Sequence, residues 1–341
     1  MGGIRMKRSA CVRLLLVLAL WSVPAQPQLL KLDSADDRKG DTGYVPHWDP
    51  VQDRLLAYRD TSDSALATAR VFDSSGNSVP LFLLRDFPGA KSLHVWAAAA
   101  SPDGGAILSV LVTYIDGQMN KTGRSLLLSY DGAGVLRKVW NVDPYIHRQL
   151  AVDRDGNVYA LGHYISTTKG SYPLLVKYSA DGKLLRELLF SSTFPQGDEV
   201  VTGGPSTEGT AIVVSGDDLF AYVTATQELF KFSSDGTLEG RTDLEGTLRH
   251  FAASRGFNRF DILAWGIRNT SEIVAHVRFI AQPGASHKIQ FTMLRIATDG
   301  SYVQKIDDPP SAPAFTFLGT NSNGRMVFVE RQKDGTHLTS Y

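Results

Sequence analysis

The stretch AVDRDGNVYALGHY (151–164) places an Asp-Gly-Asn reversal between two apolar segments that suit β-strands. Asp-Gly and Asn-Gly are favoured in two-residue hairpin turns, because both central residues of such a turn need a positive φ. The stretch therefore predicts a β-hairpin. Comparable reversals between apolar segments recur at 48–58, 99–114, 212–224 and 320–330.

A second kind of hairpin alternates with the first. It has an apolar strand, a Gly-containing turn and then a strand with interleaved Lys, Arg or Glu, as at 70–84, 126–140, 174–188, 229–244 and 293–306. Alternation of this kind is typical of an outer, half-exposed strand pair. The turn glycines at 76, 132, 182, 236 and 300 are 56, 50, 54 and 64 residues apart. Two hairpins per period of about 50 residues indicate a β-propeller with four strands in each blade.

The count of units predicts an all-β, six-bladed propeller. The expected blades are 45–85, 93–140, 147–190, 208–244, 249–306 and 314–341. The last blade is one strand short, and the extended segment QPQLLKLDS (26–34) is available to complete it. Closing the ring in this way would remove an exposed sheet edge. After residue 25, no stretch keeps a helical apolar period for more than two turns.

Local motifs resemble two families of propeller repeat. DRDGNVYAL (153–161) and LLVKYSADGK (174–183) resemble the beginning and the end of an NHL repeat, whereas SPDG (101–104) resembles the repeat of TolB-type propellers. The resemblance implies six blades. It implies no single function, because these families include hydrolases, lyases, binding domains of receptors and scaffolds.

Residues 1–25 have the pattern of a secretory signal peptide. A basic start precedes the apolar run 14–21, and Val23-Pro24-Ala25 supplies small residues for cleavage near Ala25-Gln26. We therefore expect a secreted or periplasmic protein; the alternative is an uncleaved N-terminal anchor. The only cysteine, Cys11, lies in this segment, so the mature chain would contain no disulfide.

The charge balance bears on the partner. The whole chain has 35 Lys and Arg and 35 Asp and Glu, and four of the basic residues lie in the predicted signal, so the mature chain has a net charge of 31 − 35 = −4. A nucleic acid or an anionic membrane binds proteins that have a basic face, so this net negative charge argues against both as partners. No later stretch approaches the roughly 20 apolar residues that a membrane-spanning helix needs. We expect a monomer that binds a protein or a small molecule.

Four histidines occupy similar places relative to their blades: His47, His94, His147 and His250. Each lies in the connector that leads into the innermost strand of its blade, and we expect these connectors to surround one mouth of the central channel. Converging imidazoles could hold a metal, and His94, His147 and His250 are the predicted ligands, with His163 as an additional candidate. The alternative is that neutral histidines lie among water in a polar channel. A recognition surface at the mouth would combine the four histidines with Trp48, Trp96 and Tyr145. For Trp48 and Trp96 the alternative is packing between blades.

The remaining motifs favour binding over catalysis. Asp153, Asp155 and Asn157 have the spacing of a calcium loop, but Val158 stands where glycine is needed and Tyr164 where a bidentate glutamate is needed. No serine lies in a G-x-S-x-G setting and no phosphate-binding loop occurs. We therefore predict an exported binding or scaffold protein without a cofactor. The alternative is a lyase or lactonase-like hydrolase that uses the channel histidines and a divalent metal, zinc or calcium. The insertion 266–290 predicts a long hairpin that projects beside the channel mouth. The alternative is an ordinary strand pair of 272–281 with 287–294.

Overall fold

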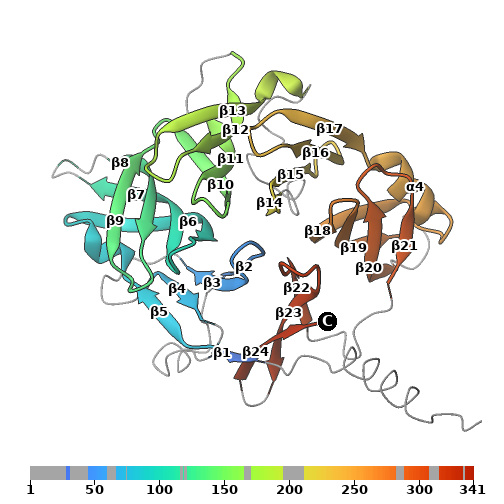
Figure 1. Ribbon diagram of the computed structural model, residues 1–341, viewed down its shortest axis with the longest axis horizontal. Coiled ribbons are helices and arrows are strands. Elements are labelled where there is room, and N and C mark those ends of the chain that lie inside the picture. The colour runs from blue at the N-terminus through green and yellow to red at the C-terminus, as the bar shows by residue number, and fades with distance from the viewer. Residues whose placement is uncertain are drawn as a thin grey trace, which may run out of the picture.

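The structure is a computed structural model that describes residues 28–30, 45–59, 67–73, 75–115, 118, 121–164, 170–194, 211–281, 288–306, 315–332 and 335–341. The predicted signal peptide lies outside the described residues. Six four-stranded antiparallel sheets stand around a central axis, and the first strand of each of the five sheets between β2 and β21 is nearest to that axis (Figure 1). The predicted all-β, six-bladed propeller is confirmed.

The first three blades follow the chain from the inside outward. Blade 1 consists of β2 (Val45–Asp49), β3 (Arg54–Tyr58), β4 (Ala69–Phe72) and β5 (Ser78–Leu81). Blade 2 consists of β6 (Ala90–Ala100), β7 (Ala106–Ile115), β8 (Lys121–Tyr130) and β9 (Leu136–Asn141). Blade 3 consists of β10 (Tyr145–Val152), β11 (Val158–Tyr164), β12 (Pro173–Tyr178) and β13 (Leu184–Phe190). Short 3-10 helices η1 (Leu83–Asp86) and η2 (Ser191–Thr193) follow blades 1 and 3.

The next two blades repeat this order. Blade 4 consists of β14 (Ala211–Ser215), β15 (Asp218–Val223), β16 (Glu228–Phe232) and β17 (Leu238–Asp243). Blade 5 consists of β18 (Arg259–Asn269), β19 (Glu272–Ile280), β20 (Ile289–Ala297) and β21 (Val303–Lys305). β19 and β20 pair over nine residues without a register shift and are the two middle strands of the blade. In the described residues this is the ordinary strand pair considered as the alternative, not a hairpin that projects beside the channel mouth.

Blade 6 joins the two ends of the described chain. Its strands are β22 (Phe315–Thr320), β23 (Met326–Gln332), β24 (Gly335–Ser340) and, outermost, β1 (Gln28–Leu30). β1 pairs antiparallel with β24, with Leu29 opposite His337. The predicted closure of the ring by the N-terminal strand is confirmed.

The predicted two-residue type is present at 216–217, where Ser215 pairs with Asp218, but several other hairpin turns differ from it. In the 153–157 turn the Gly156 amide donates to the Asp153 carbonyl, and the Asp153 amide donates to the Asn157 carbonyl. Gly156 has a φ of +82°, and Asp155 is not among the described residues with positive φ. This is a type I turn followed by a left-handed glycine that forms a bulge, so only one residue needs positive φ. The same pair of bonds closes the turns at 101–105, 131–135, 179–183, 233–237 and 321–325.

Apolar side chains fill the space between neighbouring blades. Of the described residues, six buried clusters lie at the six interfaces between blades. The clusters that flank blade 6 have five and four buried residues, whereas each of the others has at least ten.

One helix, α4 (Glu245–Ala253), occupies the connector between blades 4 and 5. The Asp243 carboxylate accepts a hydrogen bond of 2.7 Å from the Glu245 amide at its beginning. Leu248, Phe251 and Ala252 bury one face of the helix against blade 5, the spacing typical of an amphipathic helix. No helix in the described part of the chain is long and apolar enough to cross a bilayer.

Candidate binding site

A cavity of about 190 Å³ lies on the axis, between the innermost strands. Five of those strands, β2, β10, β14, β18 and β22, contribute to its walls, among which are His47, Trp48, Asp49, Gln149 and Trp265. Aliphatic side chains such as Leu150 and Ile212 complete the lining. The walls therefore combine polar and apolar groups in similar measure, and a few convergent polar groups beside apolar ones are a feature of small-molecule sites.

Two polar side chains of the wall are not used by the fold. His47, on β2, and Gln149, on β10, form no side-chain hydrogen bond with any residue that the structure describes. Burial lowers the pKa of His47 to about 4, so its imidazole is neutral at physiological pH. His47 therefore offers one donor and one acceptor, and the Gln149 amide offers both kinds of group.

Trp48 and Asp49, by contrast, hold blade 1 to its neighbours. Trp48 Nε1 donates a 2.9 Å hydrogen bond to the Thr320 carbonyl of blade 6, and the ring is buried in the cluster between those two blades. Packing between blades, the alternative considered for Trp48, is therefore what its contacts show, although one side of the ring also faces the cavity.

Asp49 faces the other neighbour. Its Oδ2 accepts a 2.9 Å bond from the Ala100 amide of blade 2, and its Oδ1 accepts 3.0 Å bonds from the amides of Val51 and Gln52. The side chain is only 2% exposed, and burial raises its pKa to about 6 against the effect of these amides. Three backbone amides thus satisfy the hydrogen-bonding capacity of the Asp49 carboxylate in the absence of a ligand.

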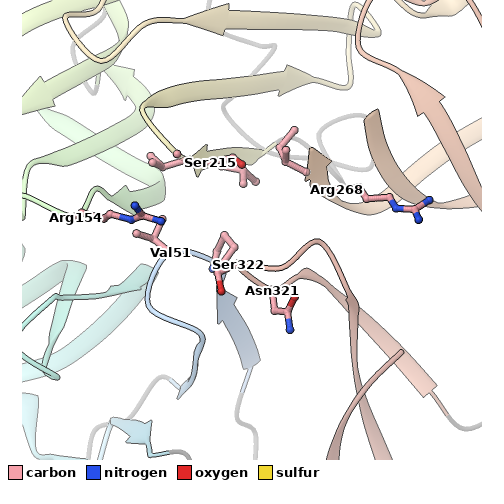
Figure 2. A pocket seen from close by; sticks show the side chains of 11 residues that line it. Val51, Arg154, Ser215, Arg268, Asn321 and Ser322 are labelled. Carbon is pink, nitrogen blue, oxygen red and sulfur yellow. The ribbon is translucent and has the colours of Figure 1, made fainter. Parts of the chain in front are cut away.

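A smaller cavity of about 40 Å³ continues from the first at the mouth formed by the hairpin turns. The two cavities share Pro50, Val51, Val213 and Val214. Figure 2 shows Arg154 reaching toward the opening near Val51, while Arg268 extends away from it. Arg268 lies 3.6 Å from Glu272 in an ion pair. The turns thus form a polar rim at this end of the channel.

Four of the predicted mouth residues lie on two adjacent innermost strands, inside the strands and not in the connectors before them. The rings of His94 and Trp96 on β6 are 3.9 Å apart, and Arg148 lies 3.7 Å above Trp96. Tyr145 and His147 on β10 stack at 6.1 Å. Tyr145 further contacts Tyr164, which contacts Tyr172. The result is an aromatic cluster on blades 2 and 3.

His147 is the most buried of these residues, with 1% exposure. Its Nε2 lies 3.1 Å from the Tyr178 hydroxyl, and its Nδ1 has no hydrogen-bond partner in the described structure. Burial, and secondarily His163, lowers the pKa of His147 to about 3. Its contacts are those of a neutral side chain packed inside blade 3.

His250 lies apart from the other three histidines. It is exposed on α4, a helix at the outer side of blade 5 (Figure 1), whereas His94 and His147 belong to innermost strands. The expected extended connector is a helix here because the apolar spacing of Leu244, Leu248 and Phe251 buries one helical face. The structure does not bring His94, His147 and His250 together. Among the described residues no group of three or more His, Cys, Asp or Glu could hold a metal ion.

The 153–157 loop is occupied by its own backbone. Asp153 Oδ1 accepts the amides of Asp155 and Asn157 at 3.0 and 2.8 Å, and Oδ2 accepts the Asn157 side-chain amide at 2.9 Å. Lys177 lies 3.6 Å from the same carboxylate. These contacts match the turn that the sequence favoured over calcium binding.

Protonation of His147 gives a testable pH dependence. The unfolded chain protonates this histidine near pH 6.5, whereas the folded chain keeps it neutral to about pH 3. The stability that depends on neutral His147 is therefore present above about pH 6.5 and is lost as the pH falls. We expect the loss of unfolding free energy between pH 7 and pH 5 to be about 2 kcal/mol smaller in His147→Gln.

Urea unfolding at the two pH values measures this difference. Glutamine keeps a hydrogen-bonding group for Tyr178, and His250→Gln, on exposed α4, is the matched control that should behave like the unmodified protein. An identical pH dependence in His147→Gln would show that the pKa of this histidine is the same in the folded and the unfolded chain.

Sequence reasoning did not find Gln149 or Trp265. Neither lies in a motif, and each reaches the cavity only because its strand is innermost. In β10 a bulge between His147 and Gln149 shifts the register. A strand bulge of this kind carries no signal in the local sequence.

The comparisons with known proteins concern the fold. No family model and no curated protein matches the chain. A member of the DUF4221 family from Bacteroides vulgatus has 8% identity and a TM-score of 0.48, covering 93% of this chain and 96% of that one. A candidate exported protein of Bacteroides fragilis has 11% identity and a TM-score of 0.49, covering 94% and 96%. A gluconolactonase from Xanthomonas campestris has 12% identity and a TM-score of 0.40, covering 94% and 97%.

The NHL and TolB resemblances stay predictions, because nothing in the structure distinguishes these subtypes. What the strand order establishes is the architecture itself. The chain is a six-bladed β-propeller whose last blade is completed by the strand at residues 28–30.

Proposed function

We propose that the chain is an exported binding protein that holds a small, uncharged, polar molecule in its central cavity. The observation that carries this proposal is the cavity of about 190 Å³, walled by two tryptophans and aliphatic side chains, in which His47 and Gln149 have hydrogen-bonding groups that the described fold does not use. The volume is many times the roughly 10–15 Å³ that a single bound water requires. It therefore suits a ligand of monosaccharide or nucleobase size better than a protein segment.

The charges of the wall favour an uncharged ligand. His47 is neutral at physiological pH, and the Asp49 carboxylate already accepts three amide hydrogens. A charged ligand would lose its hydration without gaining a free opposite charge from the described wall. Export is supported by the basic, apolar and small-residue pattern of residues 1–25.

Binding can be followed through the emission of Trp48 and Trp265. The purified chain from residue 26 onward would be titrated with uncharged pentoses, hexoses and nucleobases and, separately, with sugar acids, sugar phosphates and amino sugars. We expect saturable binding of an uncharged compound, and binding at least tenfold weaker for its charged analogue.

Gln149→Leu removes the amide at nearly constant volume and should weaken binding at least tenfold. Gln304→Leu, the same change on exposed β21, should leave it unchanged. Equal binding of charged analogues, no binding within the panel, or an unaffected Gln149→Leu variant would each contradict the proposal.

A further inference from the structure

The outer edge of blade 5 is only partly paired. β20 has nine residues, but its outer partner β21 pairs with just Leu294, Arg295 and Ile296. Beyond them the ladder continues with one bond, in which the Ile306 amide donates to the Met293 carbonyl at 2.9 Å. No described residue pairs with this edge of β20 between residues 289 and 292.

The hydrogen bonds of β20 show which of its backbone amides and carbonyls point to the outer edge. The Ala297 amide donates outward to the Tyr302 carbonyl, and the Met293 carbonyl accepts from Ile306 on the same side. In a regular antiparallel strand, alternate residues direct both amide and carbonyl to the same edge. β20 pairs with β19 without a register shift, so Ile289 and Phe291 direct their amides and carbonyls outward.

Apolar side chains mark the same positions. Ile289 is 54% exposed and Phe291 is 53% exposed, more than any other large apolar side chain in the described structure. Phe291 contacts His276 with its ring at 5.8 Å. Phe291 lies two residues before Met293 in β20, so their side chains lie on the same face of the sheet. Met293 packs into the cluster between blades 5 and 6, so this face is the one toward blade 6.

Two exposed cations of the described structure lie near this edge. Lys288 and Arg259 are exposed, and Arg259 stands in register with Ile280 and, through it, with Ile289. Neither cation forms an ion pair with a described carboxylate. The nearby Asp261 is bound by Arg278 at 2.9 Å, so it does not neutralise them.

We propose that this edge binds an extended segment of a partner protein as an added strand. The partner segment would have apolar residues in alternation, facing Ile289 and Phe291, and acidic residues near Lys288 and Arg259. Strand addition to an open edge obtains affinity from main-chain bonds and specificity from alternate side chains.

Hydrogen exchange at single amides tests the proposal independently of the channel ligand. In the free full mature chain, the amides of Ile289 and Phe291 should exchange rapidly. The probe is a nine-residue peptide with valine at alternate positions, threonine between them and Asp or Glu at both ends. Its addition should slow exchange at both amides at least tenfold, and fluorescence anisotropy should show saturable binding.

Variants separate this edge from other exposed apolar sites. Phe291→Asp should weaken peptide binding at least tenfold. Leu238→Asp, at a 49% exposed position of outer strand β17, is the matched control and should bind normally. A peptide with Lys in place of Asp and Glu should bind at least tenfold more weakly.

Four results would overturn the proposal. Slow exchange at Ile289 and Phe291 in the free chain would mean that the chain itself covers the edge. A dimer in sedimentation that Phe291→Asp dissociates would assign the edge to a second copy. Equal binding of the basic peptide, or no protection by the acidic one, would exclude the partner chemistry stated here.

Discussion

A chain that begins at residue 35 is expected to have a free energy of unfolding about 2–4 kcal/mol lower than a chain that begins at residue 26. The shorter chain lacks β1, which pairs with β24 at residues 336–338. Each backbone hydrogen bond lost contributes about 1 kcal/mol, and the link between the two ends of the ring is lost with them.

The loss falls on the blade that joins the two ends of the described chain. The removal of β1 also leaves β24 as an open edge, and open edges promote association between chains.

Urea unfolding and light scattering of the two chains measure these effects. A synthetic peptide of residues 26–34, added to the shorter chain, should restore part of the stability, and a scrambled peptide should not. Equal stability of the two chains would contradict the importance of the closing strand.

The second large effect is expected from Asp49→Ala, which should lower the free energy of unfolding by about 3–5 kcal/mol. The substitution leaves the amides of Val51, Gln52 and Ala100 without their acceptor in a position that is 2% exposed. Each buried amide left without a partner costs about 1–3 kcal/mol, and water in the cavity can replace only part of these bonds.

Asp73→Ala is the matched control. Asp73 also accepts two backbone amides, from Ser75 and Asn77, but it is exposed, so water can replace its carboxylate. We expect a loss below about 1 kcal/mol there. Asp49→Asn should be intermediate in urea unfolding, because it keeps one acceptor oxygen. A loss at Asp49→Ala no larger than at Asp73→Ala would show that Asp49 does not hold blades 1 and 2 together.

The turns show how far local sequence reaches. Asp-Gly and Asn-Gly at regular intervals predicted where the chain reverses, and the reversals lie there. They did not predict the turn type, because Asp-Gly suits both a two-residue turn and a type I turn with a left-handed glycine. The 131–135 turn illustrates this: the left-handed residue is Gly134, with a φ of +77°, and not Gly132.

The histidines show where local sequence stops. His47 was expected at the channel and lines the cavity, because its place at the start of a blade fixes its distance from the axis. His250 had an equivalent place in the count of blades, yet it lies on α4. Whether a connector is extended or helical depends on the apolar surface that it can bury against the neighbouring blade, and that surface comes from residues distant in the chain.

The sequence by itself determined the repeat, the number of blades and the strand that closes the ring, since turn residues and alternation act over a few neighbouring residues. Only the tertiary structure decided which side chains share the central cavity and which strand edge stays open. Those relations join residues such as His47 and Gln149, about 100 positions apart, and they depend on strand register and ring geometry, which no local pattern encodes.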